Sequence, residues 1–99
     1  MNDKELVKKI INMVKIKYPK ELLIGYFKYK NKYIFTYMTE SDDIEGERIN
    51  GRYYVGHYSS RMIEYNKEKD SVEYAYYPQS EWWKIKKTQK FNWVINLYN

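Results

Sequence analysis

Aromatic side chains alternate with other residues through much of the middle of this chain, and this spacing favours β-strands. Thirteen of the 99 residues are tyrosine. Tyr33, Phe35 and Tyr37 stand at every second position, which places them on one face of an extended strand. Tyrosine suits a sheet with one dry and one wet face, because its ring packs while its hydroxyl reaches water or a partner. The pattern therefore predicts an antiparallel sheet with more rings than a core of this size holds.

One amphipathic helix is expected ahead of the sheet, over residues 3–17. Apolar residues recur in this segment at spacings of three and four. They are Leu6, Val7, Ile10, Ile11, Met13 and Val14. Asn2 is a favourable N-cap, and Glu5, three residues later, completes a capping box. Pro19 ends the helical pattern.

A first hairpin is predicted directly after the helix, with strands at 22–29 and 33–39. Asn31 lies in the short connection and tolerates the left-handed backbone that tight turns require. Alternation divides the side chains of the first strand between two faces. One face would carry Leu22, Ile24 and Tyr26, and the other Leu23, Phe27 and Tyr29.

Further strands are expected at 52–59, 61–65 and 72–77. Gly56 lies inside the first of them and indicates a bulge or a close approach of another segment. The other two form a second hairpin, because the segment that joins them is short, charged and polar. Pro78 ends the last strand.

The segment after residue 78 fits two interpretations. Ser80 can cap a helix that begins with Trp82 and Trp83. Alternatively, large and charged residues alternate as in a strand at Trp83, Ile85 and Lys87. The sequence favours a strand or irregular stretch to about residue 86 and a short helix from about residue 88.

Together these elements predict a single α+β domain over residues 1–99, with one N-terminal helix packed on a four- or five-stranded antiparallel sheet. The helix face of Leu6, Ile10 and Val14 is expected to lie over one face of the sheet. The residues it would cover are Ile24, Phe35, Val55 and Val72. The opposite face of the sheet is expected to be open and rich in tyrosine.

Composition argues against catalysis. The chain has no cysteine and one histidine, His57, so thiol chemistry and cysteine zinc sites are excluded. Ser59 and Ser60 follow this histidine, but no nucleophile turn of the G-x-S-x-G type is present. The sequence predicts a protein that is not an enzyme and needs no cofactor or metal. A mean hydropathy of −0.88 and the lack of a signal-like start favour a soluble, cytoplasmic protein with no membrane partner.

Charge is distributed unevenly along the chain. Five of the thirteen acidic residues fall in the polar stretch 40–47, which has no basic residue. They are Glu40, Asp42, Asp43, Glu45 and Glu47. A solvated loop is the preferred interpretation, and an acidic contact loop for a basic partner is the second. The remaining chain has 18 basic and 8 acidic residues, which suits nucleic acid or an acidic protein. The codon usage of an AT-rich genome also produces such a composition and is the preferred interpretation.

Two groups of residues are candidates for binding a macromolecule. Exposed tyrosine and tryptophan are good protein contacts. The predicted partner-binding residues are Tyr54, Tyr58, Tyr74, Tyr76, Tyr77, Trp82 and Trp83. The alternative is a nucleic-acid contact in the C-terminal segment, where lysines bind phosphate and aromatic rings stack on bases. Its residues are Lys84, Lys86, Lys87, Lys90 and Trp93.

The order of the predicted elements resembles that of the small cystatin-like or NTF2-like bacterial immunity proteins. The residues that carry the resemblance are Val55-Gly56-His57, Arg61 to Glu68 and Asp70 to Glu73. It implies a non-catalytic protein that neutralises another macromolecule and implies no particular contact residue. We therefore expect a small inhibitor, either an immunity protein or a virus-encoded anti-defence protein. Nucleic-acid binding is the alternative function, and pairing of aromatic faces into a homodimer is a further possibility.

Overall fold

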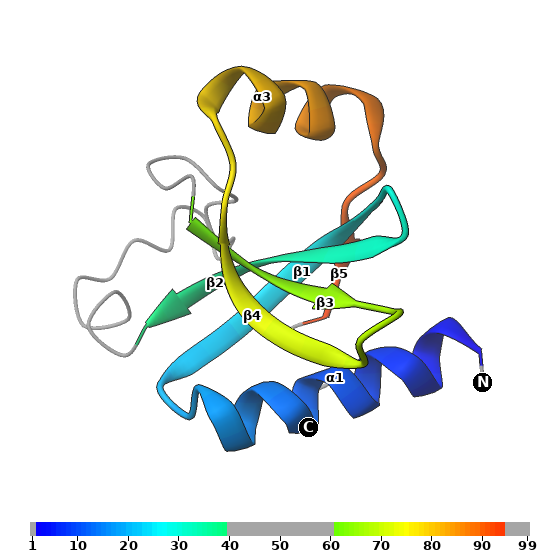
Figure 1. Ribbon diagram of the computed structural model, residues 1–99, viewed down its shortest axis with the longest axis vertical. Helices are drawn as coiled ribbons and strands as arrows, with labels where there is room; N and C mark the ends of the chain where they lie inside the picture. The colour runs from blue at the N-terminus through cyan, green and yellow to red at the C-terminus, as the bar shows by residue number, and fades with distance from the viewer. Residues whose placement is uncertain (1, 40–60, 95–99) are drawn as a thin grey trace.

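The computed structural model describes residues 2–39 and 61–94 of the chain (Figure 1). The strand predicted at 52–59 lies outside these residues, and so do Val55, Gly56 and His57.

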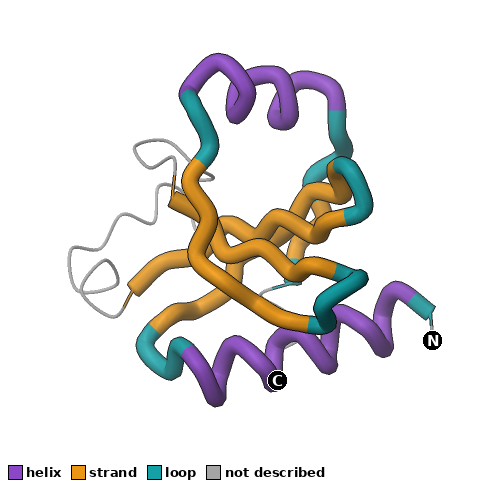
Figure 2. Tube along the Cα trace, in the orientation of Figure 1, coloured by secondary structure: helices purple, strands orange, loops and turns teal. Residues whose placement is uncertain are grey.

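Two helices and five strands make up the described part (Figure 2). In chain order they are α1 (Asp3–Lys17), β1 (Glu21–Tyr29), β2 (Lys32–Thr39), β3 (Arg61–Asn66), β4 (Ser71–Tyr76), α3 (Gln79–Thr88) and β5 (Asn92–Trp93). The strands form one antiparallel sheet in the order β4-β3-β2-β1-β5. The predicted α+β architecture, with an N-terminal helix on an antiparallel sheet, is confirmed.

The N-terminal helix α1 begins and ends where its sequence signals place it. The side-chain oxygen of Asn2 accepts a hydrogen bond from the backbone N–H of Glu5 at 2.9 Å, which satisfies one of the free donors of the first turn. The last turn carries Lys15 and Lys17, whose charges suit the helix C-terminus. The residue that ends the helix is Tyr18, directly before Pro19.

Both hairpins turn through residues with a left-handed backbone. In the β1–β2 turn, Lys30 and Asn31 have φ angles of 48° and 62°, as the position of the asparagine predicted. In the β3–β4 turn, Asp70 has φ 48°. The side chain of Asn66 accepts the backbone N–H groups of residues 68 and 69 at 2.9 and 3.1 Å. These local bonds replace the strand pairing that the chain loses as it reverses.

A β-bulge interrupts the pairing of β1 with β2. Leu23 lies opposite Tyr37, but Gly25 lies opposite Thr36, so Ile24 is an extra residue on β1. The bulge changes which side chains of β1 face each side of the sheet. Side-chain alternation therefore cannot be carried unchanged through the strand.

The bulge corrects one part of the predicted helix contact. Leu23 and Tyr26, three residues apart, both pack in the cluster beneath α1, whereas strict alternation placed Ile24 there. The prediction for Phe35 and Val72 agrees with the structure, because both lie in this cluster.

The two helices cover opposite faces of the sheet, α1 below it and α3 above it in Figure 1. Side chains of β2 and β3 alternate between the two resulting clusters. The sheet residues under α1 are Leu23, Tyr26, Tyr33, Phe35, Ile63, Tyr65 and Val72. The cluster under α3 contains Phe27, Ile34, Met62, Trp82 and Ile85. The expectation of an open tyrosine-rich face opposite α1 is therefore wrong, since α3 covers that face with apolar side chains.

The C-terminal segment has the reverse of the predicted order, because a helix comes first and a strand follows. Trp82 and Ile85 are 3% and 0% exposed, and their spacing of three puts both on the same face of a helix. Burying this pair against Phe27 and Met62 requires helix rather than strand geometry. Farther on, β5 pairs antiparallel with β1 where a helix was predicted.

Candidate binding surfaces

Three tyrosines of the interior each use the hydroxyl to bind a carboxylate. In every case the ring packs against the core while the O–H donates to an oxygen that is still partly exposed. The pairs are Tyr33 with Asp3 (2.9 Å), Tyr65 with Asp70 (2.6 Å) and Tyr77 with Glu64 (2.5 Å). These rings hold the fold together and are not free contact residues, which accounts for part of the high tyrosine content.

The same three carboxylates each hold a lysine as well. The ion pairs are Asp3 with Lys28, Asp70 with Lys9 (2.8 Å) and Glu64 with Lys32 (3.2 Å). Each tyrosine, carboxylate and lysine thus forms a three-membered unit that links two segments of the chain. Because the charges lie at the surface, the ion pairs themselves stabilise the fold only slightly. Their larger consequence is that they neutralise lysines on the β1–β2 hairpin and on α1.

In the units of Asp3 and Asp70, the pKa of the carboxyl and that of the tyrosine shift in opposite directions. Hydrogen bonds from Lys9 and Tyr65 lower the pKa of the Asp70 carboxyl, and bonds from Lys28 and Tyr33 lower that of Asp3. Burial, and then the bond to Asp70, raises the pKa of Tyr65 to about 12. The folded protein therefore favours the charged carboxylates and the neutral phenols.

The raised pKa of Tyr65 is expected to make the folded protein less stable at alkaline pH, and a substitution tests this. Its pKa is raised on folding from 10.0 to about 12, so its contribution to stability is complete below about pH 10 and is lost as the pH rises from there. Tyr65→Phe is expected to reduce the dependence of unfolding free energy on pH above about pH 10. Urea titrations at several pH values measure this. Tyr76→Phe, which removes a phenol on a residue 76% exposed, is the matched control. Equal slopes for the wild type and Tyr65→Phe would contradict the assignment.

A tyrosine surface lies on the α1 side of the sheet, and we define it as Tyr18, Tyr37, Tyr74 and Tyr76. The ring of Tyr74 lies 4.1 Å from that of Tyr18 and 5.9 Å from that of Tyr37, measured between centroids. Tyr74 nevertheless remains 47% exposed, and Tyr76, two residues along the same strand, is 76% exposed. The strand that carries both is β4, at one edge of the described sheet.

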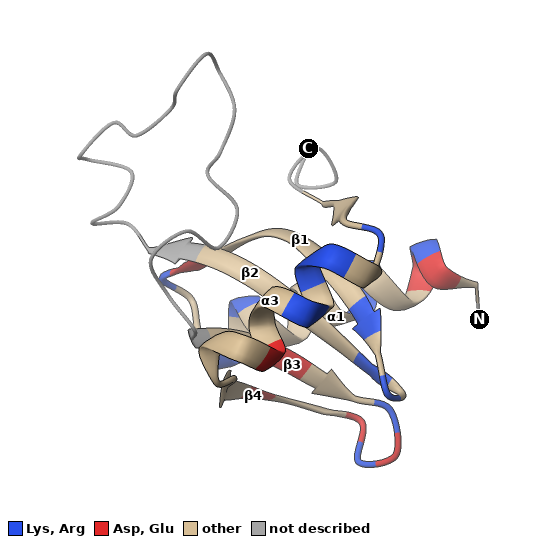
Figure 3. Ribbon diagram, turned by 90° about the horizontal axis from the view of Figure 1, so that it is seen from above, with Lys and Arg blue, Asp and Glu red and all other residues tan. Residues whose placement is uncertain are grey.

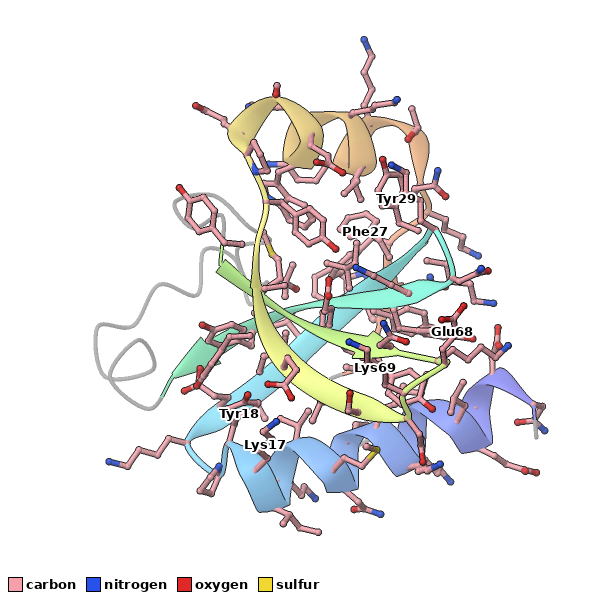
Figure 4. All side chains as sticks on the ribbon, viewed as in Figure 1. Lys17, Tyr18, Phe27, Tyr29, Glu68 and Lys69 are labelled. Atoms are coloured by element: carbon pink, nitrogen blue, oxygen red, sulfur yellow. The ribbon has the colours of Figure 1, made fainter. Side chains whose placement is uncertain are left out.

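Lys17 and Glu73 form an ion pair beside the tyrosine surface. Lys17 donates to Glu73 at 2.7 Å and to the backbone carbonyl of Val72 at 2.8 Å. It and Tyr18 lie at the end of α1, beside β4 (Figure 4). The hydrogen bond to Glu73 raises the pKa of the Lys17 ammonium. Beside the rings, Lys17 and Glu73 therefore form a pair without net charge.

A second surface lies on the outer side of α3 and on β5. We call it the α3 surface and define it as Trp83, Lys84, Lys86, Lys87, Lys90 and Trp93. Trp83 is 60% exposed and Trp93 47% exposed. The ammonium of Lys86 lies 4.5 Å from the centroid of the Trp83 ring, within the range of a cation–π contact. Figure 3 shows basic residues along this helix.

Some of the predicted partner-binding residues lie on one or the other of these two surfaces, and others lie on neither. Tyr74 and Tyr76 lie on the tyrosine surface and Trp83 on the α3 surface. Trp82 is 3% exposed and offers no ring to a partner. Tyr77 is half-buried, and its hydroxyl already donates to Glu64. The remaining candidates, Tyr54 and Tyr58, lie outside the described residues, as does the acidic stretch 40–47.

Sequence reasoning missed two residues of the tyrosine surface, Tyr18 and Tyr37. The sequence predicts a strand that contains Tyr37 but no contact for it, and it predicts no role for Tyr18. The only local signal is that Tyr18 precedes Pro19, which stops the helix and leaves the ring beside the first strand. Its contact with Tyr74 joins residues far apart in the sequence, and no local pattern indicates it.

Comparison with protein-family models, with curated proteins and with solved structures gives no match to this chain. Within residues 2–39 and 61–94, no helix is both long and apolar enough to cross a membrane. The same segments contain no group of three acidic or histidine side chains that could share a metal ion. Functional argument therefore depends on the two surfaces.

Proposed function

We propose that this protein is a non-catalytic binding protein that contacts a protein partner through the tyrosine surface. The observation that carries the proposal is the exposure of Tyr74 and Tyr76, 47% and 76%, on an edge strand. A cluster of aromatic rings that stays exposed in the folded chain is typical of a protein contact.

The pairing of Lys17 with Glu73 beside these rings favours a protein over a nucleic acid as the partner. Aromatic residues are enriched and charged ones depleted at the centres of protein interfaces. Lys17 is already paired with Glu73 and is poorly placed to bind phosphate as well. β4 is also an edge strand of the described sheet, and the backbone groups of an edge strand can pair with an extended segment of a partner.

The proposed role is stoichiometric neutralisation of the partner, as expected of an immunity protein or a virus-encoded anti-defence protein. It agrees with the resemblance to small immunity proteins. The contact surface differs from the original expectation, because α3 covers the sheet face that was predicted to be open. The rings that remain for a partner lie instead at the β4 edge, on the α1 side.

The test is affinity capture from a host lysate with and without nuclease treatment, followed by calorimetry with the captured partner. Tyr74→Ala combined with Tyr76→Ala is expected to weaken binding at least about tenfold, since exposed tyrosines at interface centres commonly contribute more than about 1 kcal/mol each. Trp83→Ala is the control, because it removes an equally exposed ring on the other side of the sheet.

Two results would overturn this proposal. One is capture that disappears after nuclease treatment. The other is an affinity that is unchanged when both tyrosines are replaced, with circular dichroism showing that the variant is folded. Sedimentation equilibrium of the isolated protein shows whether the chain forms a dimer. If it does, and if the tyrosine substitutions dissociate that dimer, the partner is a second copy of this chain and not another protein.

A further inference from the structure

The buried side of α3 packs on the sheet and fixes the position of the α3 surface. Trp82 and Ile85 fix the helix on the sheet with almost no exposure. One turn of the helix then requires Trp83, Lys84 and Lys87 to point outward, and all three are exposed. The position of these side chains therefore follows from the packing beneath them.

Three lysines of this surface have no carboxylate partner within the described residues. The ion pairs found in residues 2–39 and 61–94 use Lys9, Lys17, Lys28 and Lys32. Between residues 79 and 94 there are four lysines and one acidic residue, Glu81. Lys84, Lys87 and Lys90 make no ion pair with the described carboxylates. A concentrated positive charge is thus left for an external anion.

Aromatic rings are interleaved with these lysines. Lys86 lies over the rings of both tryptophans of α3, 5.5 Å from that of Trp82 and 4.5 Å from that of Trp83. This contact restricts the exposed indole of Trp83 before any ligand arrives. At the other end, Trp93 meets Phe91 edge to face with 4.9 Å between ring centroids.

The two ends of the surface are joined through a continuous series of ring contacts. Phe91 packs on Phe27 at 5.1 Å, and Phe27 packs edge to face on Trp82 at 5.5 Å. Phe27 and its neighbour on the strand, Tyr29, lie between the sheet and α3 (Figure 4). The exposed ring of Trp93 is thus connected to the buried ring of Trp82, and Lys86 lies over both Trp82 and the exposed Trp83.

We propose that the α3 surface is a binding site for single-stranded nucleic acid. Trp83 and Trp93 stack on bases, while Lys84, Lys87 and Lys90 contact the phosphates between them. The positive charge of the lysines favours a polyanion as the ligand. The exposed indoles favour a polyanion whose flat bases are accessible for stacking. This site is separate from the tyrosine surface, so it does not depend on the protein partner proposed above.

The observations favour single strands over a duplex. In a duplex the base faces are stacked on each other and are not available to an indole that projects from a protein surface. The described part of the chain also contains no helix-turn-helix pair, since α1 and α3 lie on opposite faces of the sheet. Stacking is tolerant of sequence, so little preference among bases is expected.

The test uses the full chain and a fluorescently labelled oligothymidylate of about 12 nucleotides, a length within the usual range for one small binding surface. Fluorescence anisotropy gives the dissociation constant at several salt concentrations. Three lysine–phosphate contacts predict a slope of log affinity against log salt of about −2. Trp83→Ala is expected to weaken binding about tenfold, which corresponds to the loss of one stacked base.

A matched pair of double variants separates a site from general attraction to a basic protein. Lys84→Ala with Lys87→Ala is expected to reduce the salt slope by about two thirds. Lys4→Ala with Lys8→Ala removes the same charge from α1, on the other side of the sheet, and is expected to leave the slope nearly unchanged.

Four outcomes would overturn the inference. They are no binding at low salt, equal losses for the two double variants, tighter binding to a duplex of the same length, and equally effective competition by polyglutamate. The last two would identify duplex binding or simple polyanion binding instead. None of these results affects the tyrosine surface, whose own test uses a protein partner and nuclease-treated lysate.

Discussion

Replacing Trp82 by alanine is expected to lower the free energy of unfolding by about 4 kcal/mol, as removal of a large buried aromatic ring usually does. The side chain is 3% exposed. It packs edge to face on Phe27, at 5.5 Å between centroids, in a cluster with Met62 and Ile85. Small domains are stable by roughly 5–15 kcal/mol in total. The melting temperature is therefore expected to fall by about 20 °C, measured by circular dichroism and urea titration.

Trp83→Ala is the control for this experiment, because it removes the same side chain from the next position. Trp83 is 60% exposed, so its loss is expected to change stability by less than about 0.5 kcal/mol. The comparison also tests the local structure. In a strand, Trp83 and Ile85 would share the buried face, whereas in a helix Trp82 and Ile85 share it. A larger loss for Trp83→Ala than for Trp82→Ala would show that α3 is not helical.

The N-terminal helix and the two hairpins could be predicted because their signals are local. A cap, a repeated apolar spacing and a following proline define α1 within about twenty residues. Asn31 marks one turn in the same way, and the charged stretch after Tyr65 marks the other. In these segments the preferred local conformation is also the one that the tertiary structure uses.

The C-terminal segment could not be predicted because two periodicities coexist in it. Trp83, Ile85 and Lys87 alternate as in a strand, while Trp82 and Ile85 have helical spacing. Whether this segment forms a helix or a strand depends on the surface against which it packs. That surface is made by Phe27, Ile34 and Met62, which belong to three different strands. Only the assembled sheet presents that face, so the helix is a consequence of tertiary packing.

The burial of the tyrosines was unpredictable for a similar reason. Tyr33 reaches Asp3 across 30 positions of sequence. The interior of the sheet accepts such rings because each hydroxyl finds a carboxylate at the edge of the core. Counting aromatic residues correctly indicated a surplus, since Tyr74, Tyr76 and Trp83 are exposed. It did not indicate that the surplus is divided between two faces.

The distribution of carboxylates distinguishes the two surfaces better than the distribution of rings does. Asp3, Glu64, Asp70 and Glu73 each lie against a lysine of α1 or of the β1–β2 hairpin. Lys17, beside the tyrosine surface, is therefore paired, whereas Lys84, Lys87 and Lys90 of the α3 surface make no ion pair with a described carboxylate. Rings without charge suit a protein contact, and rings among cations suit nucleic acid. The net charge of the chain alone does not separate these cases.

Gly25→Ala is expected to destabilise the protein by about 3 kcal/mol, because the position has no space for a side chain. A Cβ at this position would overlap the ring of Phe91 and lie 2.6 Å from the backbone oxygen of Asn92. The backbone of β5 would have to move away from β1, with loss of the bond from the Val94 N–H to the Ile24 carbonyl, now 2.9 Å. Hydrogen exchange is expected to show faster exchange of the Val94 amide, with protection retained between β2 and β3.

Combining this change with Phe91→Ala separates the two clashes. If the ring is the main obstacle, the double variant is no less stable than Phe91→Ala alone, because the space vacated by the ring accepts the new methyl group. If the backbone oxygen of Asn92 is the main obstacle, the two losses add, since removing the ring does not move the strand. A loss below about 0.5 kcal/mol for Gly25→Ala, within the range of ordinary surface substitutions, would contradict the close approach of β5 to the bulge. The bulge would then have to be explained by the β1–β2 pairing alone, without any requirement for glycine.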